Sequence, residues 1–191
     1  NRSVEMAKKY GVELVVRSSL TSEEGTVVKE VVKMEKMLIT GVAADRNTVR
    51  ISAIGVKDEP GIAFKIFNTL AKNNINVDII LQSVGRNGTK DISFTVSEED
   101  LKEALAILEE KKEVLTIKEL TYSTDVAKVS IVGAGMLSNP GVAAKMFESL
   151  FNSNININMI STSEIRITVL IDEKDTEKAM IAIHDGFGLN D

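Results

Sequence analysis

The stretch Asp58-Glu59-Pro60-Gly61-Ile62-Ala63-Phe64-Lys65-Ile66-Phe67 decides the fold, because the chain contains it twice. The second copy reads Asn139-Pro140-Gly141-Val142-Ala143-Ala144-Lys145-Met146-Phe147. Both copies continue in gapless register to Asn74-Ile75-Asn76-Val77 and Asn154-Ile155-Asn156-Ile157. A repeat of this length determines the architecture before any local motif does. The 191 residues therefore contain two copies of one small domain.

The first copy alternates between strand and helix patterns. Val49–Gly55 alternates apolar and polar residues like a half-buried strand, and Pro60 suits the first turn of the helix that follows. The remaining expected elements are strands at Ile75–Val84 and Asp91–Val96 joined through an Asn87-Gly88 turn, a helix at Glu98–Lys111 with Ser97 as its N-cap, and a strand at Leu115–Thr121. The order β-α-β-β-α-β predicts a ferredoxin-like α+β domain.

The second copy shows the same elements except the last strand. We expect strands at Ala127–Gly133, Ile155–Ser163 and Ile165–Ile171, and helices at Pro140–Asn152 and at Glu173–His184, the latter with Asp172 as its N-cap. Upstream of the first copy, Met37–Ala43 has the composition of a strand but belongs to no unit. We therefore expect it to complete the second unit (residues 34-47 and 123-191), with the first unit (48-122) inserted within the second.

Residues 1–33 lie outside the repeat. Ser3–Tyr10 has the spacing of a short helix that Gly11 ends, and Glu13–Arg17 has that of a strand. Ser18–Thr26 is a polar loop, and Val27–Lys33 is a linker. A helix and a strand of this size cannot bury a core alone. They form either a docking tail or the edge of another domain, and we favour the edge of another domain.

The composition excludes several classes of function. A net charge of −5 without a run of Lys or Arg argues against a nucleic-acid partner, and the absence of cysteine excludes disulfides and thiol chemistry. No apolar stretch approaches the roughly 20 residues of a membrane span, so we expect no membrane association and a cytoplasmic location. His184 is the only histidine and is expected on a helix surface. The sequence predicts no catalytic residue, no metal site and no cofactor in this chain.

The repeated Pro-Gly stretch suggests a site for an amino acid. A helix that starts after such a turn exposes backbone N–H groups, which attract a carboxylate by about 0.3–1 kcal/mol. Gly61 and Gly141 have no Cβ, so a small ligand can approach the backbone closely. Asp58 beside the first turn could hold the ammonium group. A single Pro-Gly turn is more often only a turn, but the second copy favours a ligand site.

Polar residues interrupt the apolar strands that follow each helix. They are Asn76, Asp78 and Gln82 in the first unit, and Asn156, Asn158 and Ser161–Ser163 in the second. If two units pair side by side, the loop of one faces the strand start of the other, and a ligand in the seam would supply hydrogen-bond partners for buried Asn side chains. Alternatively, these residues cap strand ends and contact water, which the spacing supports equally well.

These motifs resemble the paired ACT domains of the aspartate kinase family. Lys57–Ala63 together with Ile75–Gln82 resembles the first ACT domain. Val132–Met136, Pro140–Ala143 and Ile160–Arg166 resemble the second. The resemblance extends from about Leu38 to the C-terminus, and Lys9–Ser19 resembles the last helix and strand of the kinase domain.

The resemblance implies that the chain is the feedback-regulatory part of an aspartate kinase, which phosphorylates L-aspartate with ATP in the biosynthesis of lysine, threonine and methionine. The catalytic residues, with ATP and Mg, would belong to a kinase domain that this chain lacks, and in some bacteria the ACT pair is also made as a separate small subunit. The implied partners are threonine and/or lysine as effector, the kinase catalytic domain or subunit, and a second copy of the chain in a homodimer. The alternative is a stand-alone ACT pair that senses amino acids or dimerises and regulates another enzyme.

The resemblance also implies two effector sites. The first site would consist of Asp58, Gly61, Ile62, Ala63 and Gln82, with Asn156 and Ile157 of a facing second unit. The second site would consist of Met136, Ser138, Gly141 and Val142, with Asn76, Val77 and Asp78 of a facing first unit. The second loop has two extra residues and no acid that matches Asp58. We therefore expect one site to be weaker, empty or selective for a different amino acid.

Overall fold

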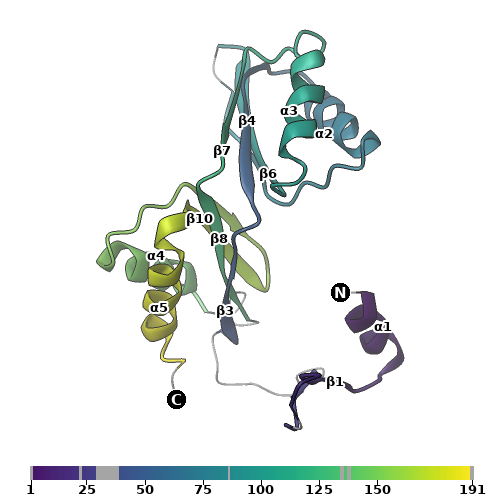
Figure 1. Cartoon of the computed structure of the whole chain (residues 1–191). Coiled ribbons are helices and arrows are strands. Elements are labelled where there is room, and N and C mark those ends of the chain that lie inside the picture. Colours follow the sequence, from purple (N-terminus) through teal and green to yellow (C-terminus); the bar gives the residue numbers. More distant parts are fainter. Residues whose placement is uncertain are drawn as a thin grey trace. The chain divides into compact units, whose positions relative to one another are not determined.

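The computed structural model describes residues 2–21, 23–28, 39–85, 87–133, 136 and 139–189 (Figure 1). The chain divides into a small unit, Asn1–Met37, and a large unit, Leu38–Asp191.

The described residues of the small unit form one helix and one strand pair. Helix α1 (Arg2–Tyr10) ends at Gly11, whose φ of 63° is left-handed, which confirms the predicted helix stop. Strands β1 (Leu14–Val16) and β2 (Thr26–Val28) pair antiparallel. Strand β2 was not predicted, because its valines were assigned to a linker. The rest of that linker, residues 29–33, lies outside the described residues.

The first repeat is an antiparallel sheet with two helices on one face (Figure 1). Its strands, in the order β5-β6-β4-β7, are β4 (Val49–Lys57), β5 (Ile80–Gln82), β6 (Thr89–Val96) and β7 (Glu119–Ser123). Helices α2 (Ile62–Lys72) and α3 (Leu101–Glu110) bury Ile66, Leu70 and Leu108 against Ile51, Ile92 and Phe94 of the sheet. The β-α-β-β-α-β prediction is confirmed for this repeat.

The second repeat has the same architecture, and the strand that takes the place of β7 comes from before the first repeat. The sheet order is β3-β8-β10-β9, with β3 (Gly41–Asp45), β8 (Val126–Val132), β9 (Met159–Thr162) and β10 (Arg166–Asp172). Its helices are α4 (Val142–Asn152) and α5 (Thr176–Phe187), the latter preceded by the short 3-10 helix η2 (Glu173–Asp175). Strand β3 pairs with β8, Val42 lying opposite Ile131. The insertion inferred from strand counting is confirmed.

Several expected boundaries are wrong. The strand expected at Met37–Ala43 begins at Gly41, and residues 37 and 38 lie outside the described residues. The strands expected at Ile75–Val84 and Ile155–Ser163 are reduced to β5 and β9. Each preceding helix is followed by an asparagine in the left-handed region, with φ of 59° at Asn74 and 52° at Asn154. The chain therefore reaches the edge of the sheet late, and only its last residues form the ladder.

The expected last strand of the first unit, Leu115–Thr121, is displaced to β7. Thr116 has φ 54°, which breaks an extended run. Leu115 and Ile117 are nevertheless buried in the core, so their apolar character reports packing and not strand structure.

The starts of the helices also differ from expectation. Pro60 does not lie in the first helical turn, because α2 begins at Ile62 after an N-cap at Gly61. The helix expected from Glu98 begins at Leu101, although the Ser97 hydroxyl still accepts a hydrogen bond from the Asp100 N–H at 3.3 Å. Asp172 precedes η2 and not the long helix, and its side chain makes no cap hydrogen bond.

Candidate functional site

The two Pro-Gly loops begin α2 and α4 in the same way. Gly61 (φ 87°, ψ −5°) and Gly141 (φ 98°, ψ −5°) are the N-caps, and no side chain caps either helix. Pro followed by a glycine with these angles is typical of a type II turn. Neither helix has an acidic residue in its first turn. Each therefore presents the positive end of its dipole to an outside anion.

Gly61 and Gly141 allow the backbone conformation of the loops, and the space around each of them is open. A Cβ added to Gly61 or Gly141 would meet no atom within 4 Å, apart from the chain neighbours. A residue with a side chain would still be strained there, because L residues rarely adopt such positive φ values. The loops thus combine a fixed backbone with room for a small molecule.

Asp58 is held beside the first loop by contacts that the sequence analysis missed. Lys90 Nζ lies 2.8 Å from Asp58 Oδ1, and the Asp58 N–H donates to the Gly88 carbonyl at 2.8 Å. Gly85 packs so close to the Asp58 carboxylate that any Cβ there would collide with it. The carboxylate therefore has a fixed position with Lys90 as a cationic partner, and its side chain remains 45% exposed. Lys90 lies opposite Val56 in the pairing of β6 with β4, and no local pattern near Asp58 indicates that pairing.

Glu59 forms a second charged group at this turn. Its carboxylate lies 2.8 Å from Lys57 Nζ and 3.3 Å from Lys65 Nζ. The hydrogen bond from Lys57, with that from Lys65, lowers the pKa of Glu59 below its usual value. The same contact raises the pKa of Lys57. These charges surround the turn that precedes α2.

The other expected members of the first site are spread over the chain. Ile62 is buried in the first core, Ala63 is half-buried, and Gln82 is exposed at the end of the edge strand β5. Asn156 is exposed, and Ile157 is partly buried against the second core. Asn76 and Asn156 are both exposed in the single chain, and their burial in a seam between paired units stays a prediction.

The expected members of the second site fall into two groups. Asn76, Val77 and Asp78 line a pocket of about 340 Å³ whose lining also includes Asp45 and Lys128. The other group does not line this pocket: Val142 is buried in the second core, Met136 packs partly buried against it, and Gly141 begins α4. Ser138 lies outside the described residues.

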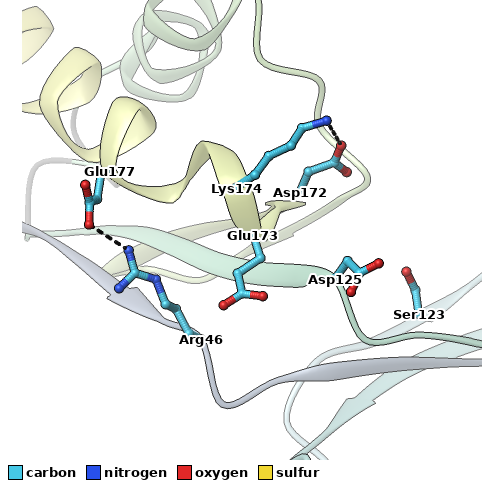
Figure 2. Close-up of a pocket in the computed structure, with 7 residues that line it drawn as sticks. All are labelled: Arg46, Ser123, Asp125, Asp172, Glu173, Lys174 and Glu177. Atoms are coloured by element: carbon cyan, nitrogen blue, oxygen red, sulfur yellow. Dashed lines mark hydrogen bonds and ion pairs between the residues drawn. The ribbon is translucent and has the colours of Figure 1, made fainter.

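A second pocket lies near the segments that connect the repeats (Figure 2). It has a volume of about 850 Å³ and is lined by Arg46, Ser123, Asp125, Asp172, Glu173, Lys174 and Glu177. Arg46 pairs with Glu177 at 3.3 Å and Lys174 with Asp172 at 3.4 Å. Carboxylates outnumber cations here, so the pocket repels the carboxylate of an amino acid. It contains no residue of the two expected sites.

Asp172, at the rim of that pocket, is bonded to a polar residue of the second repeat. The Asn158 side-chain amide donates to Asp172 Oδ1 at 3.1 Å. This hydrogen bond, followed by the contact with Lys174, lowers the pKa of Asp172.

Other kinds of site find little support in the described part of the chain. Its His, Asp and Glu residues form no group of three or more that could hold a metal ion. None of its helices has the length and apolar character that crossing a membrane requires. His184 lies on helix α5, and its side chain is half-buried there.

Comparison with known proteins identifies the class. The sequence profile of the ACT domain matches residues 49–111 and 129–187, which are the two repeats. The chain therefore belongs to the ACT domain family.

Individual relatives show which proteins of the ACT domain family this chain is similar to. The aspartokinase of Bacillus sp. (strain MGA3) is 46% identical over 190 residues, 99% of this chain. The solved regulatory subunit of aspartate kinase from Thermus thermophilus is 43% identical with a TM-score of 0.74, and the match covers 99% of that chain and 78% of this one. A solved structure of aspartokinase alpha and beta subunits matches at 47% identity and TM-score 0.74, with the same coverage. The ACT pair is thus the regulatory region of an aspartokinase.

The chain spans about half the length of the curated relatives it matches, for example 46% of the Bacillus protein.

Proposed function

We propose that the ACT pair binds an amino acid effector, threonine and/or lysine, and thereby controls an aspartate kinase that phosphorylates L-aspartate with ATP in the cytoplasm. The observation that carries this proposal is the duplicated helix start at Gly61 and Gly141. Both helices lack a side-chain cap and an acidic first turn, and both open into free space. A carboxylate of an effector is the natural partner for such N–H groups.

The two sites would differ in how they bind the ammonium group. The first loop has Asp58, whose ionised carboxylate offers about four acceptor sites and can accept hydrogen bonds besides the contact with Lys90. The second loop has no matching acid, and Asp78 would have to come from a facing first unit. We therefore propose that the first site binds its effector more tightly.

The proposed sites are completed by a second copy of the chain. Asn76–Asp78 line the pocket of about 340 Å³, and Gly141 is not among the described residues that line it. Strands β5 and β9 are the edges of their sheets, and each exposes an isoleucine, Ile80 at 49% and Ile160 at 40%. A homodimer that pairs these edges would cover the isoleucines and bring the loop of one repeat to the strand of the other.

Residues 1–33 would be the end of the kinase domain. That domain would bind ATP and Mg and would contain the catalytic residues. The small unit leaves Met6, Tyr10 and Leu20 exposed at 47%, 65% and 92%. These apolar side chains suit a surface covered by the rest of a domain. The full-length Bacillus aspartokinase matches 99% of this chain, whereas the separate Thermus subunit matches 78%. This difference supports a kinase origin for the leading residues.

The test is calorimetric titration of the chain with threonine and lysine, separately and together. We expect saturable binding of at least one of them. Asp58→Ala should weaken binding at the first site, whereas Glu103→Ala, which removes an exposed acid from α3 of the same repeat, should not. Heats of dilution alone for both amino acids, with a folded chain, would contradict the proposal and favour a dimerisation module without a ligand.

A further inference from the structure

Lys128 bridges the two ACT repeats. It lies on β8 of the second repeat, and its Nζ is 2.7 Å from Asp78 Oδ2 of the first repeat and 2.9 Å from Asp45 Oδ2. Its side chain is only 12% exposed. Burial lowers the pKa of Lys128, but hydrogen bonds and charges from Asp78 and Asp45 outweigh burial, so the pKa is raised. The ammonium is therefore charged at neutral pH and held between two carboxylates.

The two carboxylates have different structural roles. Asp45 lies directly opposite Lys128 in the register of β3 and β8, so that contact stays within the second sheet. Asp78 belongs to the first repeat, so its ion pair with Lys128 joins one repeat to the other. Arg166 of the second repeat approaches the same carboxylate more weakly, with Nη2 at 3.9 Å from Asp78 Oδ1.

An apolar contact accompanies this ion pair. Ile79, the residue after Asp78, packs in one cluster with Val126, Met159 and Leu170 of the second repeat, and all four are buried. Apolar packing is non-directional, whereas a charge-assisted hydrogen bond requires a particular geometry. The cluster can hold the repeats together, and the ion pair can select one orientation among those that the cluster permits.

We propose that the Lys128–Asp78 ion pair is a clamp that sets the relative orientation of the two ACT repeats, and that an effector ammonium at Asp78 releases it. The second half rests on the proposed function. The ligand and Lys128 would compete for one carboxylate, so a ligand that binds Asp78 weakens the clamp. By linkage, weakening the clamp strengthens binding of that ligand by the same factor.

The clamp can be tested without any ligand. The chain contains no cysteine, so Glu103→Cys on α3 and Glu148→Cys on α4 would carry the only two spin labels of each chain, and an excess of unlabelled parent leaves one labelled chain per proposed dimer. The distance between them, measured by pulsed electron paramagnetic resonance, reports the orientation of the repeats. We expect a broader distance distribution for Lys128→Met and Asp78→Asn than for the parent. Distributions that coincide with that of the parent would overturn the clamp.

Two variants serve as matched controls. Asp45→Asn removes only the contact within the second sheet, and Lys102→Met removes an exposed lysine on α3; both should leave the distribution unchanged. Equal broadening in Asp45→Asn and Asp78→Asn would also overturn the clamp, because it would indicate a general loss of stability. Asp78→Asn retains the Lys128–Asp45 pair, so it remains informative if Lys128→Met fails to fold.

The effector half is tested by titrating threonine and lysine into the parent and Lys128→Met. We expect the variant to bind the ligand of the second site about fivefold more tightly, the lower end of typical allosteric coupling. Equal affinities of the parent and Lys128→Met would overturn the effector half of the proposal. The distance measurement would then decide the clamp alone. If neither protein binds either amino acid, the effector half fails together with the proposed function, and the distance measurement still decides the clamp.

Discussion

Single residues show where backbone conformation, and not side-chain contact, shapes the loops. We predict that Gly61→Ala lowers the free energy of unfolding by about 1 kcal/mol, because φ at this residue is 87° and left-handed backbone is unfavourable for L residues. A Cβ would meet no atom within 4 Å there, so no steric clash contributes. Urea unfolding measures the effect.

The matched control is Gly41→Ala. A Cβ there also meets nothing within 4 Å, and φ lies outside the left-handed region. Gly41→Ala should therefore leave the unfolding midpoint nearly unchanged. Equal midpoints for Gly61→Ala and the parent would contradict the strained-backbone explanation.

Asp172 provides a second test at this scale. We predict that Asn158→Ala raises the pKa of Asp172 toward its ordinary value, because the Asn158 amide makes the largest contribution to the lowered pKa. A carboxyl whose pKa is lowered by folding stabilises the protein above its unfolded pKa and loses that effect as pH falls through the folded pKa. The variant should thus be less sensitive to acid between these two values. An NMR titration of the carboxyl carbon gives the pKa.

Asn156→Ala is the control for this measurement, because Asn156 is exposed and two residues away. It should leave the Asp172 titration unchanged. An unchanged titration in Asn158→Ala would show that Lys174, not the amide, lowers the pKa.

The candidate residues were only partly predictable at this scale. Gly61 and Gly141 could be chosen because the repeat marks them, and Asp58 because it lies beside the first Pro-Gly turn. Lys90 and Lys128 could not be predicted, because their partners lie far along the chain. Lys128 and Asp78, for example, belong to different repeats and are 50 positions apart in the sequence. A lysine in an alternating strand pattern usually faces solvent, and nothing in its own neighbourhood reveals a carboxylate brought from another domain.

At the scale of elements, the edge strands carry the proposed dimer. We predict that Ile80→Lys combined with Ile160→Lys weakens self-association by about tenfold or more, since charges at a sheet edge oppose strand pairing and about 1.4 kcal/mol corresponds to tenfold. Sedimentation velocity at several concentrations measures the dissociation constant. Both isoleucines are exposed in the single chain, so the single chain should remain folded.

Ile181→Lys is the matched control, because Ile181 is 63% exposed on α5 and lies in no edge strand. It should leave the dissociation constant unchanged. A dimer as stable in the double variant as in the parent would exclude the edges as the interface.

The sequence predicted which segments form helices and which form strands. It predicted the bounds of these elements less well. The helices follow 3.6-residue spacing and were placed within a few residues. The strands β5 and β9 are much shorter than their apolar runs, because Ile75 and Ile155 bury their side chains while their backbones lie outside the sheet. Hydrophobic periodicity reports burial, and burial does not require a strand.

At the scale of the whole molecule, Lys128 predicts a dependence of stability on pH. Folding raises its pKa, so the stability that its charge contributes is fully present below the unfolded pKa of about 10.4 and is lost as pH rises through the folded value. We predict that the difference in unfolding free energy between the parent and Lys128→Met is constant from neutral pH to about 9 and shrinks above the unfolded pKa. Urea unfolding at a series of pH values tests this, and a difference that shrinks already at neutral pH would contradict it.

The insertion of one repeat in the other could be predicted by counting the strands of each repeat. The contact surface between the two repeats could not be predicted. The missing strand of the second repeat and the unassigned strand before the first repeat together implied the insertion, which β3 and β8 confirm. The junction at Ile79 and Lys128 was not foreseen, because the two sheets need not touch for each repeat to be complete.

The insertion has a consequence for the order in which the chain folds. Strands β3 and β8 must meet across about 80 residues, and closing so long a loop is entropically unfavourable. Arg50 and Ser123, near the two ends of the inserted repeat, lie opposite each other in its sheet. A folded first repeat therefore brings β3 and β8 together. It lowers the entropic cost of closing the loop, as a free energy, by about 2 kcal/mol. During synthesis the first repeat would also emerge before β8 does, so the inserted domain can act as the template on which its host domain closes.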